Sequence, residues 1–234
     1  MDQRDPSSDP STDRAARPDA SVTRSPTASG ASPSLAGGGG LTVSDLTLAR
    51  GDRVLVRGLS FALKPGEALV VTGANGAGKT SLLRAVAGLL RPLEGTIALE
   101  GEGERQDRLH LIGHQDGLKA GRTAGEELRF WCGWAGARYG VDTAVKTLAL
   151  QPLLPLPVRA LSAGQRKRLA MGRLIAAARP LWLLDEPLAP LDAHWREMFG
   201  ALCSAHLGTG GMILAAAHDP MPFPHRTLDL GAFQ

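Results

Sequence analysis

The sequence contains few aromatic residues and few cysteines. Of its 234 residues, 4% are aromatic and two are cysteines, Cys132 and Cys203. Neither belongs to a CxxC or CxxCH motif, so they cannot supply a disulfide framework or a haem attachment site, and we expect two ordinary thiols. With so few aromatic residues, small aliphatic side chains must fill most of the core.

Long apolar runs are also missing. No stretch approaches the roughly 18 to 20 uninterrupted apolar residues of a membrane span, so we do not expect the chain to cross a bilayer alone. Residues 1–20 lack the apolar core and cleavage pattern of a secretory signal, which favours a reducing cytoplasm. The net charge of +3 is too small to indicate nucleic-acid binding, and we expect no nucleic-acid partner.

Residues 1–40 differ in composition from the rest of the chain. They are rich in Pro, Ser, Asp, Arg, Ala and Gly, contain no aromatic residue and no Ile, and end in four glycines. Such a segment cannot bury enough apolar surface to offset its ordering entropy. We therefore predict a disordered tail over residues 1–40 and one ordered domain over residues 41–234.

From Leu41 onward, apolar runs predict alternating strands and helices. Strands are expected at 41–48, 54–56, 59–63, 68–71, 96–99, 109–112, 181–184, 212–216 and 227–230. Helices are expected at 81–90, 164–179 and 193–206, with residues 123–150 mainly helical. This alternation favours an α/β fold, with a mostly parallel sheet covered by helices on both faces.

A glycine-rich segment, Gly-Ala-Asn-Gly-Ala-Gly-Lys-Thr, follows the predicted strand 68–71 and has the spacing of a P-loop. Its glycines allow backbone N–H groups to surround an anion, and the start of the next helix adds its positive dipole end. We predict that Lys79 reaches the β- and γ-phosphates of ATP and that Thr80 holds Mg²⁺. The predicted nucleotide-binding residues are Gly73, Ala74, Asn75, Gly76, Ala77, Gly78, Lys79, Thr80 and Ser81.

The predicted strand 181–184 is followed directly by two carboxylates, Asp185 and Glu186. Phosphoryl transfer depends mainly on positioning and charge stabilisation, so one carboxylate beside the metal and one beside the water suffice. We predict that Asp185 binds Mg²⁺, directly or through water, and that Glu186 is catalytic and orients the attacking water.

The segment Leu-Ser-Ala-Gly-Gln at 161–165, about 20 residues before this strand, resembles the signature loop of the ATP-binding cassette (ABC) ATPases. The resemblance implies a P-loop NTPase fold with a mostly parallel sheet, an antiparallel β subdomain and a helical subdomain over about 116–180. It also implies a head-to-tail homodimer in which one copy contacts the ATP of the other. The residues implied in that contact are Ser162, Ala163, Gly164, Gln165 and Asp192.

Further residues occur in the family's order. The resemblance makes Gln115 and His218 catalytic, with Gln115 also contacting Mg²⁺ and His218 contacting the γ-phosphate. The loop before Asp192 departs from the family's usual sequence, so the resemblance assigns a role in this loop to Asp192 alone. Arg50 stands where the family usually has an aromatic residue stacked on adenine. It either stacks on the base through its guanidinium plane or faces solvent in a hairpin.

The segments 111–119 and 123–128 resemble one subfamily, the ATP-binding subunit of the haem exporter of cytochrome c maturation. This resemblance implies a peripheral protein on the cytoplasmic face of the inner membrane, bound to integral membrane subunits. ATP hydrolysis would drive release of a haem-loaded chaperone, with haem handled only by partners. The alternatives are the ATPase of another ABC transporter, a soluble cassette ATPase and a cassette that binds ATP without hydrolysing it. Intact Glu186 and His218 disfavour the last.

Four of the ten aromatic residues fall within about 116–160: Phe130, Trp131, Trp134 and Tyr139. They either form a groove that receives a cytoplasmic helix of the membrane subunit or pack the helical subdomain itself.

Overall fold

The computed structural model describes residues 39–136 and 140–233. The predicted tail lies almost wholly outside this range, as does Tyr139, so the domain boundary at residue 40 stays a prediction. Within the described ranges, no helix combines the length and apolar character needed to span a membrane.

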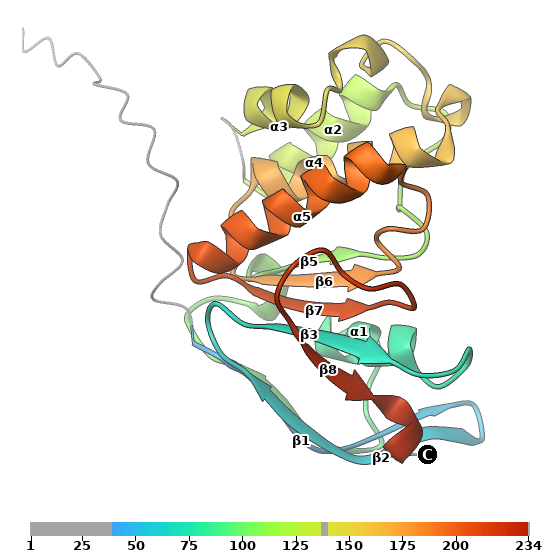
Figure 1. Ribbon diagram of the computed structural model, residues 1–234, viewed down its shortest axis with the longest axis vertical. Coiled ribbons are helices and arrows are strands. Elements are labelled where there is room, and N and C mark those ends of the chain that lie inside the picture. The colour runs from blue at the N-terminus through green and yellow to red at the C-terminus, as the bar shows by residue number, and fades with distance from the viewer. Residues whose placement is uncertain (1–38, 137–139, 234) are drawn as a thin grey trace, which may run out of the picture. The chain divides into compact units, whose positions relative to one another are not determined.

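The fold contains two sheets of different type, a parallel sheet in the middle and an antiparallel sheet at the lower end of the view (Figure 1). The antiparallel sheet has the order β2-β1-β4 and the parallel sheet the order β5-β6-β7-β3-β8. The strands are β1 (Leu41–Arg50), β2 (Arg53–Leu63), β3 (Ala68–Thr72), β4 (Glu94–Leu99), β5 (Leu109–Ile112), β6 (Leu181–Asp185), β7 (Met212–Ala216) and β8 (Arg226–Asp229).

Helices cover the parallel sheet on both sides. They are α1 (Lys79–Val86), α2 (Ala124–Trp134), α3 (Val141–Thr147), α4 (Ala163–Ala176) and α5 (Ala193–Gly208). Helix α1 packs between the two sheets, while α2, α3 and α4 contact one another and form a group that we call the helical lobe (Figure 1). The structure contains the mostly parallel main sheet, the separate antiparallel sheet and the group of helices that the resemblance implies.

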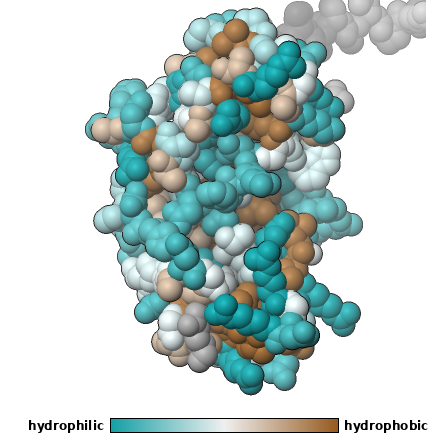
Figure 2. Space-filling view, turned by 90° about the vertical axis from the view of Figure 1, so that its right-hand side faces the viewer, coloured by the Kyte–Doolittle hydropathy of each residue, from teal (hydrophilic) through white to brown (hydrophobic). Residues whose placement is uncertain are grey.

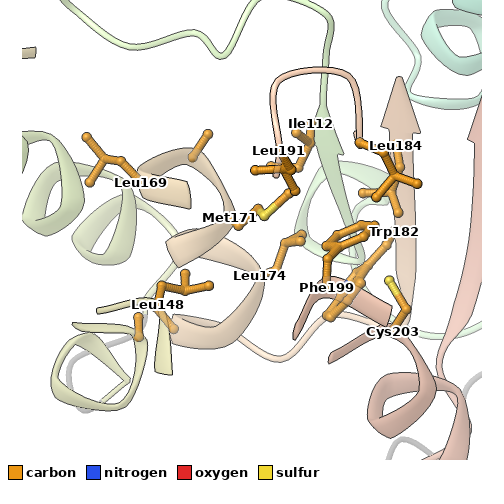
Figure 3. Close-up of a cluster of buried hydrophobic side chains, with 14 of the residues drawn as sticks. Ile112, Leu148, Leu169, Met171, Leu174, Trp182, Leu184, Leu191, Phe199 and Cys203 are labelled. Atoms are coloured by element: carbon orange, nitrogen blue, oxygen red, sulfur yellow. The ribbon is translucent and has the colours of Figure 1, made fainter. Parts of the chain in front are cut away.

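Burial on both faces explains why the parallel strands are almost continuously apolar. All five residues of β6 and all five of β7 are buried. On one face, Met171 and Leu174 of α4 point toward Trp182 of β6 and Phe199 of α5 (Figure 3). On the other face, α1 and the antiparallel sheet close a second core, which contains Leu46, Leu59, Leu82, Leu83 and Leu214.

Two helices are shorter than the sequence predicts. Helix α1 ends at Val86 rather than at residue 90, because Gly88 adopts a left-handed conformation with φ of 77° and stops the helix. Helix α4 ends at Ala176 rather than at residue 179. Ala177 is already extended, and Pro180 disfavours a helical conformation at the residue before it.

Candidate nucleotide site

The loop between β3 and α1 requires glycine for its shape. Gly73, Gly76 and Gly78 have φ angles of 134°, 82° and 108°, in a region that residues with a Cβ rarely adopt. A Cβ added at Gly78 would also lie 3.2 Å from the Cβ of Leu55 on β2. The glycine spacing seen in the sequence therefore corresponds to a tight turn that leads directly into the first turn of α1.

The ammonium group of Lys79 lies inside this loop. The side chain is buried, and Nζ donates hydrogen bonds to the carbonyl oxygens of Gly73 (2.7 Å) and Ala74 (3.3 Å). Nζ also lies 3.1 Å from Nε2 of His218. Within the part of the chain that the structure describes, Lys79 forms no ion pair, so its positive charge is available to an anion.

Thr80 and Asp185 meet where β3 and β6 end. The Thr80 hydroxyl donates a hydrogen bond of 2.9 Å to Oδ2 of Asp185, whose side chain is buried. Parallel strands end at the same edge of a sheet, which brings these two side chains together across 105 residues of sequence. A hydroxyl and a carboxylate oxygen suit Mg²⁺, which proteins commonly hold through one or two carboxylates together with substrate phosphates.

Glu186, the next residue, has a strained backbone. Its φ of 46° is unusual for a residue with a Cβ, and its N–H donates to the carbonyl oxygen of Ala216 at 2.9 Å. The Glu186 side chain lines the same cavity as the P-loop, and its Oε1 lies 3.7 Å from Nε2 of His218. The same His218 nitrogen lies 2.9 Å from Oδ1 of Asn75. The imidazole of His218 thus lies close to the side chains of Glu186, Asn75 and Lys79.

These side chains line one cavity of about 510 Å³. It is also lined by Arg50 at the end of β1 and by Leu55, and Gln115 lines an adjoining cavity of about 630 Å³ together with Thr80 and Asp185. The face on which the carboxyl ends of the parallel strands open is mainly hydrophilic across its middle (Figure 2). Of the predicted P-loop set, the residues that line the cavity are Asn75, Gly76, Gly78, Lys79, Thr80 and Ser81, while Gly73, Ala74 and Ala77 do not line it.

The residues of the signature loop lie elsewhere. Ser162 caps α4: its hydroxyl accepts from the Gln165 N–H (3.2 Å), and the Gln165 side chain accepts from the Ser162 N–H (2.8 Å). A Cβ at Gly164 would lie 2.8 Å from the carbonyl oxygen of Pro190, so the loop closely approaches the segment before Asp192. Asp192 itself caps α5, accepting from the Trp195 N–H at 3.0 Å.

Among the described residues that line the 510 Å³ cavity, none belongs to the signature set. Ala163 instead lines a separate cavity of about 370 Å³ with Glu186 and Pro190. Contact between Ser162 and the ATP held by a second copy of the chain stays a prediction.

Two features of the site were not predicted from the sequence. One is His114, which lines the cavities at the P-loop, at Gln115 and at Ala163. Lys167 and Arg173 of α4 are buried against the segment that carries Gln115. In the sequence they lie among other basic residues of an amphipathic helix, and such residues usually face solvent.

Comparison with known proteins identifies the family to which the chain belongs. Residues 56–189 match the family described as ABC transporter. The cytochrome c biogenesis ATP-binding export protein CcmA of Hyphomonas neptunium is 47% identical over 184 residues, 79% of this chain and 92% of that protein. CcmA of Nitrobacter winogradskyi is 44% identical over 195 residues, 82% of this chain and 98% of that protein.

A solved ATP-binding subunit of an ABC transporter has the same fold, with a TM-score of 0.70 at 22% identity over 76% of this chain and 79% of that chain. The chain belongs to the ABC transporter family, in the class of its ATP-binding proteins. Within that class it groups with the CcmA cytochrome c biogenesis ATP-binding export proteins, as the segments 111–119 and 123–128 predicted.

Proposed function

We propose that this chain is the ATP-hydrolysing subunit of a membrane ABC complex of cytochrome c biogenesis. In that complex, hydrolysis powers release of a haem-loaded chaperone, and haem itself is bound by partner subunits. The identity to CcmA proteins over nearly their whole length supports the choice of complex. The observation that carries the ATPase assignment is the convergence of Lys79, Thr80, Asp185, Glu186 and His218 on one cavity.

In this proposal, the P-loop binds the phosphates of ATP. Backbone N–H groups at the start of α1 point toward the anion, and the Lys79 ammonium exchanges its carbonyl partners for β- and γ-phosphate oxygens. Thr80 and Asp185, with Gln115 beside them, hold Mg²⁺, which neutralises charge on the phosphates when it is bound with the nucleotide. Arg50 lines the cavity wall, which supports a role in stacking its guanidinium plane on the adenine ring.

Glu186 and His218 act at the γ-phosphate end of the cavity. The Glu186 carboxylate lies 3.7 Å from His218, whereas Asp185 accepts the hydrogen bond of Thr80. Glu186 therefore orients the attacking water by accepting its hydrogen bond. His218 reaches both Lys79 and Glu186 and therefore holds the γ-phosphoryl group between them. Holding the water and the phosphoryl group in line supplies most of the catalysis that this reaction needs.

A second copy completes the site. Ser162, Ala163, Gly164 and Gln165 form a capped helix start whose backbone N–H groups suit a γ-phosphate, yet in one chain they lie outside the P-loop cavity. In a head-to-tail homodimer they meet the ATP held by the partner copy, with Asp192 alongside.

The membrane subunit binds a groove between α1 and the helical lobe. A cavity of about 440 Å³ lies there, lined by Leu89, Trp131, Trp134, Arg173 and Arg179 among others. Leu89, which follows α1, and Trp134 of α2 are 66% and 59% exposed, so packing within the described chain leaves both side chains largely uncovered. We propose that a cytoplasmic helix of an integral membrane subunit covers them, so that the protein sits peripherally on the cytoplasmic face of the inner membrane.

Gene deletion with complementation tests this function. Deletion should abolish mature c-type cytochromes, and the wild-type gene should restore them while Lys79→Ala, which cannot hold the phosphates, should not. Cytochrome levels that survive deletion would assign the chain to another ABC transporter. Recovery of the chain only in the soluble fraction, with or without membrane partners, would favour a soluble cassette ATPase.

A further inference from the structure

Helix α4 carries a lysine whose charge is buried. Lys167 is 3% exposed, and its ammonium forms an ion pair of 2.9 Å with Oδ1 of Asp116. The same ammonium donates to the carbonyl oxygen of Gly113 at 3.3 Å. Both partners belong to the segment after β5, and they lie on either side of Gln115 in the sequence.

A second buried cation of α4 holds the same segment. Arg173 donates to the backbone carbonyl oxygen of Asp116 at 3.2 Å, and its guanidinium lies 4.8 Å from the ring centre of Trp131 on α2. Burial lowers the pKa of Arg173 to about 10, which leaves it charged at neutral pH. The indole of Trp131 in turn donates to the buried Glu127. The segment is thus anchored to the helical lobe through both cations.

A buried cation without a partner is strongly destabilising, so the position of Lys167 depends on Asp116 and Gly113. For function it matters more that the segment after β5 depends in turn on Lys167. Gln115 lies between these two partners, is exposed, and within residues 39–136 and 140–233 forms no side-chain hydrogen bond of its own. Its place beside Thr80 and Asp185 is therefore set by the backbone that Lys167 holds.

We propose that Lys167 is a positioning residue: its ammonium, held by Asp116 and Gly113, fixes the segment that carries Gln115 to the helix that begins at the signature loop. Because Ser162 caps the start of α4, the metal side of one nucleotide and the signature loop that meets the partner's nucleotide move as one unit. Arg173 also lines the groove assigned to the membrane subunit, so the same connection passes a partner's docking to the nucleotide site. This inference rests on the proposed function for its catalytic consequence.

The test compares Lys167→Met with three reference variants of the full chain. Lys167→Arg keeps a cation that can reach Asp116. The double variant Lys167→Met/Asp116→Asn removes the unpaired carboxylate that the single change leaves. Lys146→Met is the matched control, because Lys146 is exposed on α3 in the same lobe.

ATP hydrolysis and thermal stability are measured for each variant in the complex with its membrane subunits. For Lys167→Met we expect kcat to fall about tenfold to a hundredfold, as a small displacement of a positioned group causes, with the KM for ATP within about twofold of wild type. Lys167→Arg should recover most of kcat. The double variant should recover thermal stability but not kcat, and recovery of both would reduce Lys167 to a structural role.

A second readout does not depend on hydrolysis. A nitroxide label on His114→Cys reports the mobility of the segment directly, since the native Cys132 and Cys203 are buried and escape labelling. The spectrum should sharpen in Lys167→Met and stay unchanged in Lys146→Met. Equal mobility in both would overturn the inference. A wild-type complex that hydrolyses no ATP would instead overturn the proposed function, and the label would still decide whether Lys167 holds the segment.

Discussion

Two buried histidines make the stability of the fold sensitive to acid. His110 on β5 is 4% exposed, and its Nε2 lies 2.8 Å from the carbonyl oxygen of Ala177; burial lowers its pKa to about 3. His206 on α5 is stacked on Trp182, with 3.8 Å between the ring centres, and burial lowers its pKa to about 4. Both side chains are therefore neutral in the folded chain at pH 5.

In the unfolded chain each histidine has a pKa of about 6.5 and takes up a proton as the pH falls. The unfolded state then binds more protons than the folded state, so stability is fully present above about pH 6.5 and is lost as the pH falls below it. Between pH 7 and pH 5 the loss is on the order of 2 kcal/mol for each histidine and on the order of 4 kcal/mol for both.

Denaturant unfolding of the full chain at pH 7 and pH 5, followed by circular dichroism, measures this loss. His206→Asn should roughly halve the difference between the two pH values, whatever it does to stability at pH 7. His194→Asn is the matched control, because His194 is exposed on the same helix. Equal stability at both pH values, or a difference that His206→Asn leaves intact, would refute the assignment of buried neutral histidines.

Two further predictions concern the edges of the nucleotide site and of the groove. Trp134→Ala should spare basal ATPase activity and weaken association with the membrane subunits about tenfold or more in a pull-down titration, because a large aromatic anchor is lost. Phe130→Ala is its control, since Phe130 is exposed on the same helix but does not line the groove, and equal effects would contradict the docking assignment. Arg50→Ala should raise the KM for ATP about threefold to tenfold if the guanidinium stacks on adenine. Arg53→Ala, its neighbour across the hairpin, should not, and an unchanged KM in Arg50→Ala would leave Arg50 as a solvent-facing residue.

The sequence predicted the parts of this fold that local patterns determine. The P-loop is readable because its glycines meet a local backbone requirement, and the buried strands are readable because β6 and β7 are apolar throughout. The end of α1 was misjudged only because the apolar pattern continues past Gly88, although the glycine itself signals the stop. The predicted site residues of the P-loop, Asp185, Glu186 and His218 could be selected because they end strands or follow them at known spacing.

The remaining features depend on contacts between distant segments. Nothing local distinguishes Lys167 from its basic neighbours; only the packing of α4 against the segment after β5 buries it beside Asp116. The same holds for His110 and His206, whose burial follows from neighbouring strands and helices rather than from their own surroundings in the sequence. The backbone of Glu186, with its φ of 46°, is likewise held by a hydrogen bond to Ala216 on the adjacent strand.

The central claim is that two copies of the chain bind two nucleotides between them. The Glu186→Gln variant tests it most directly, because this variant should bind Mg²⁺ and ATP but should not hydrolyse the ATP. Size-exclusion chromatography with light scattering should give about twice the 24.5 kDa chain mass when ATP is present and the single-chain mass without it. The double variant Lys79→Ala/Glu186→Gln, which cannot hold the phosphates, should stay at the single-chain mass. A single-chain mass for Glu186→Gln at saturating ATP would contradict the shared nucleotide site.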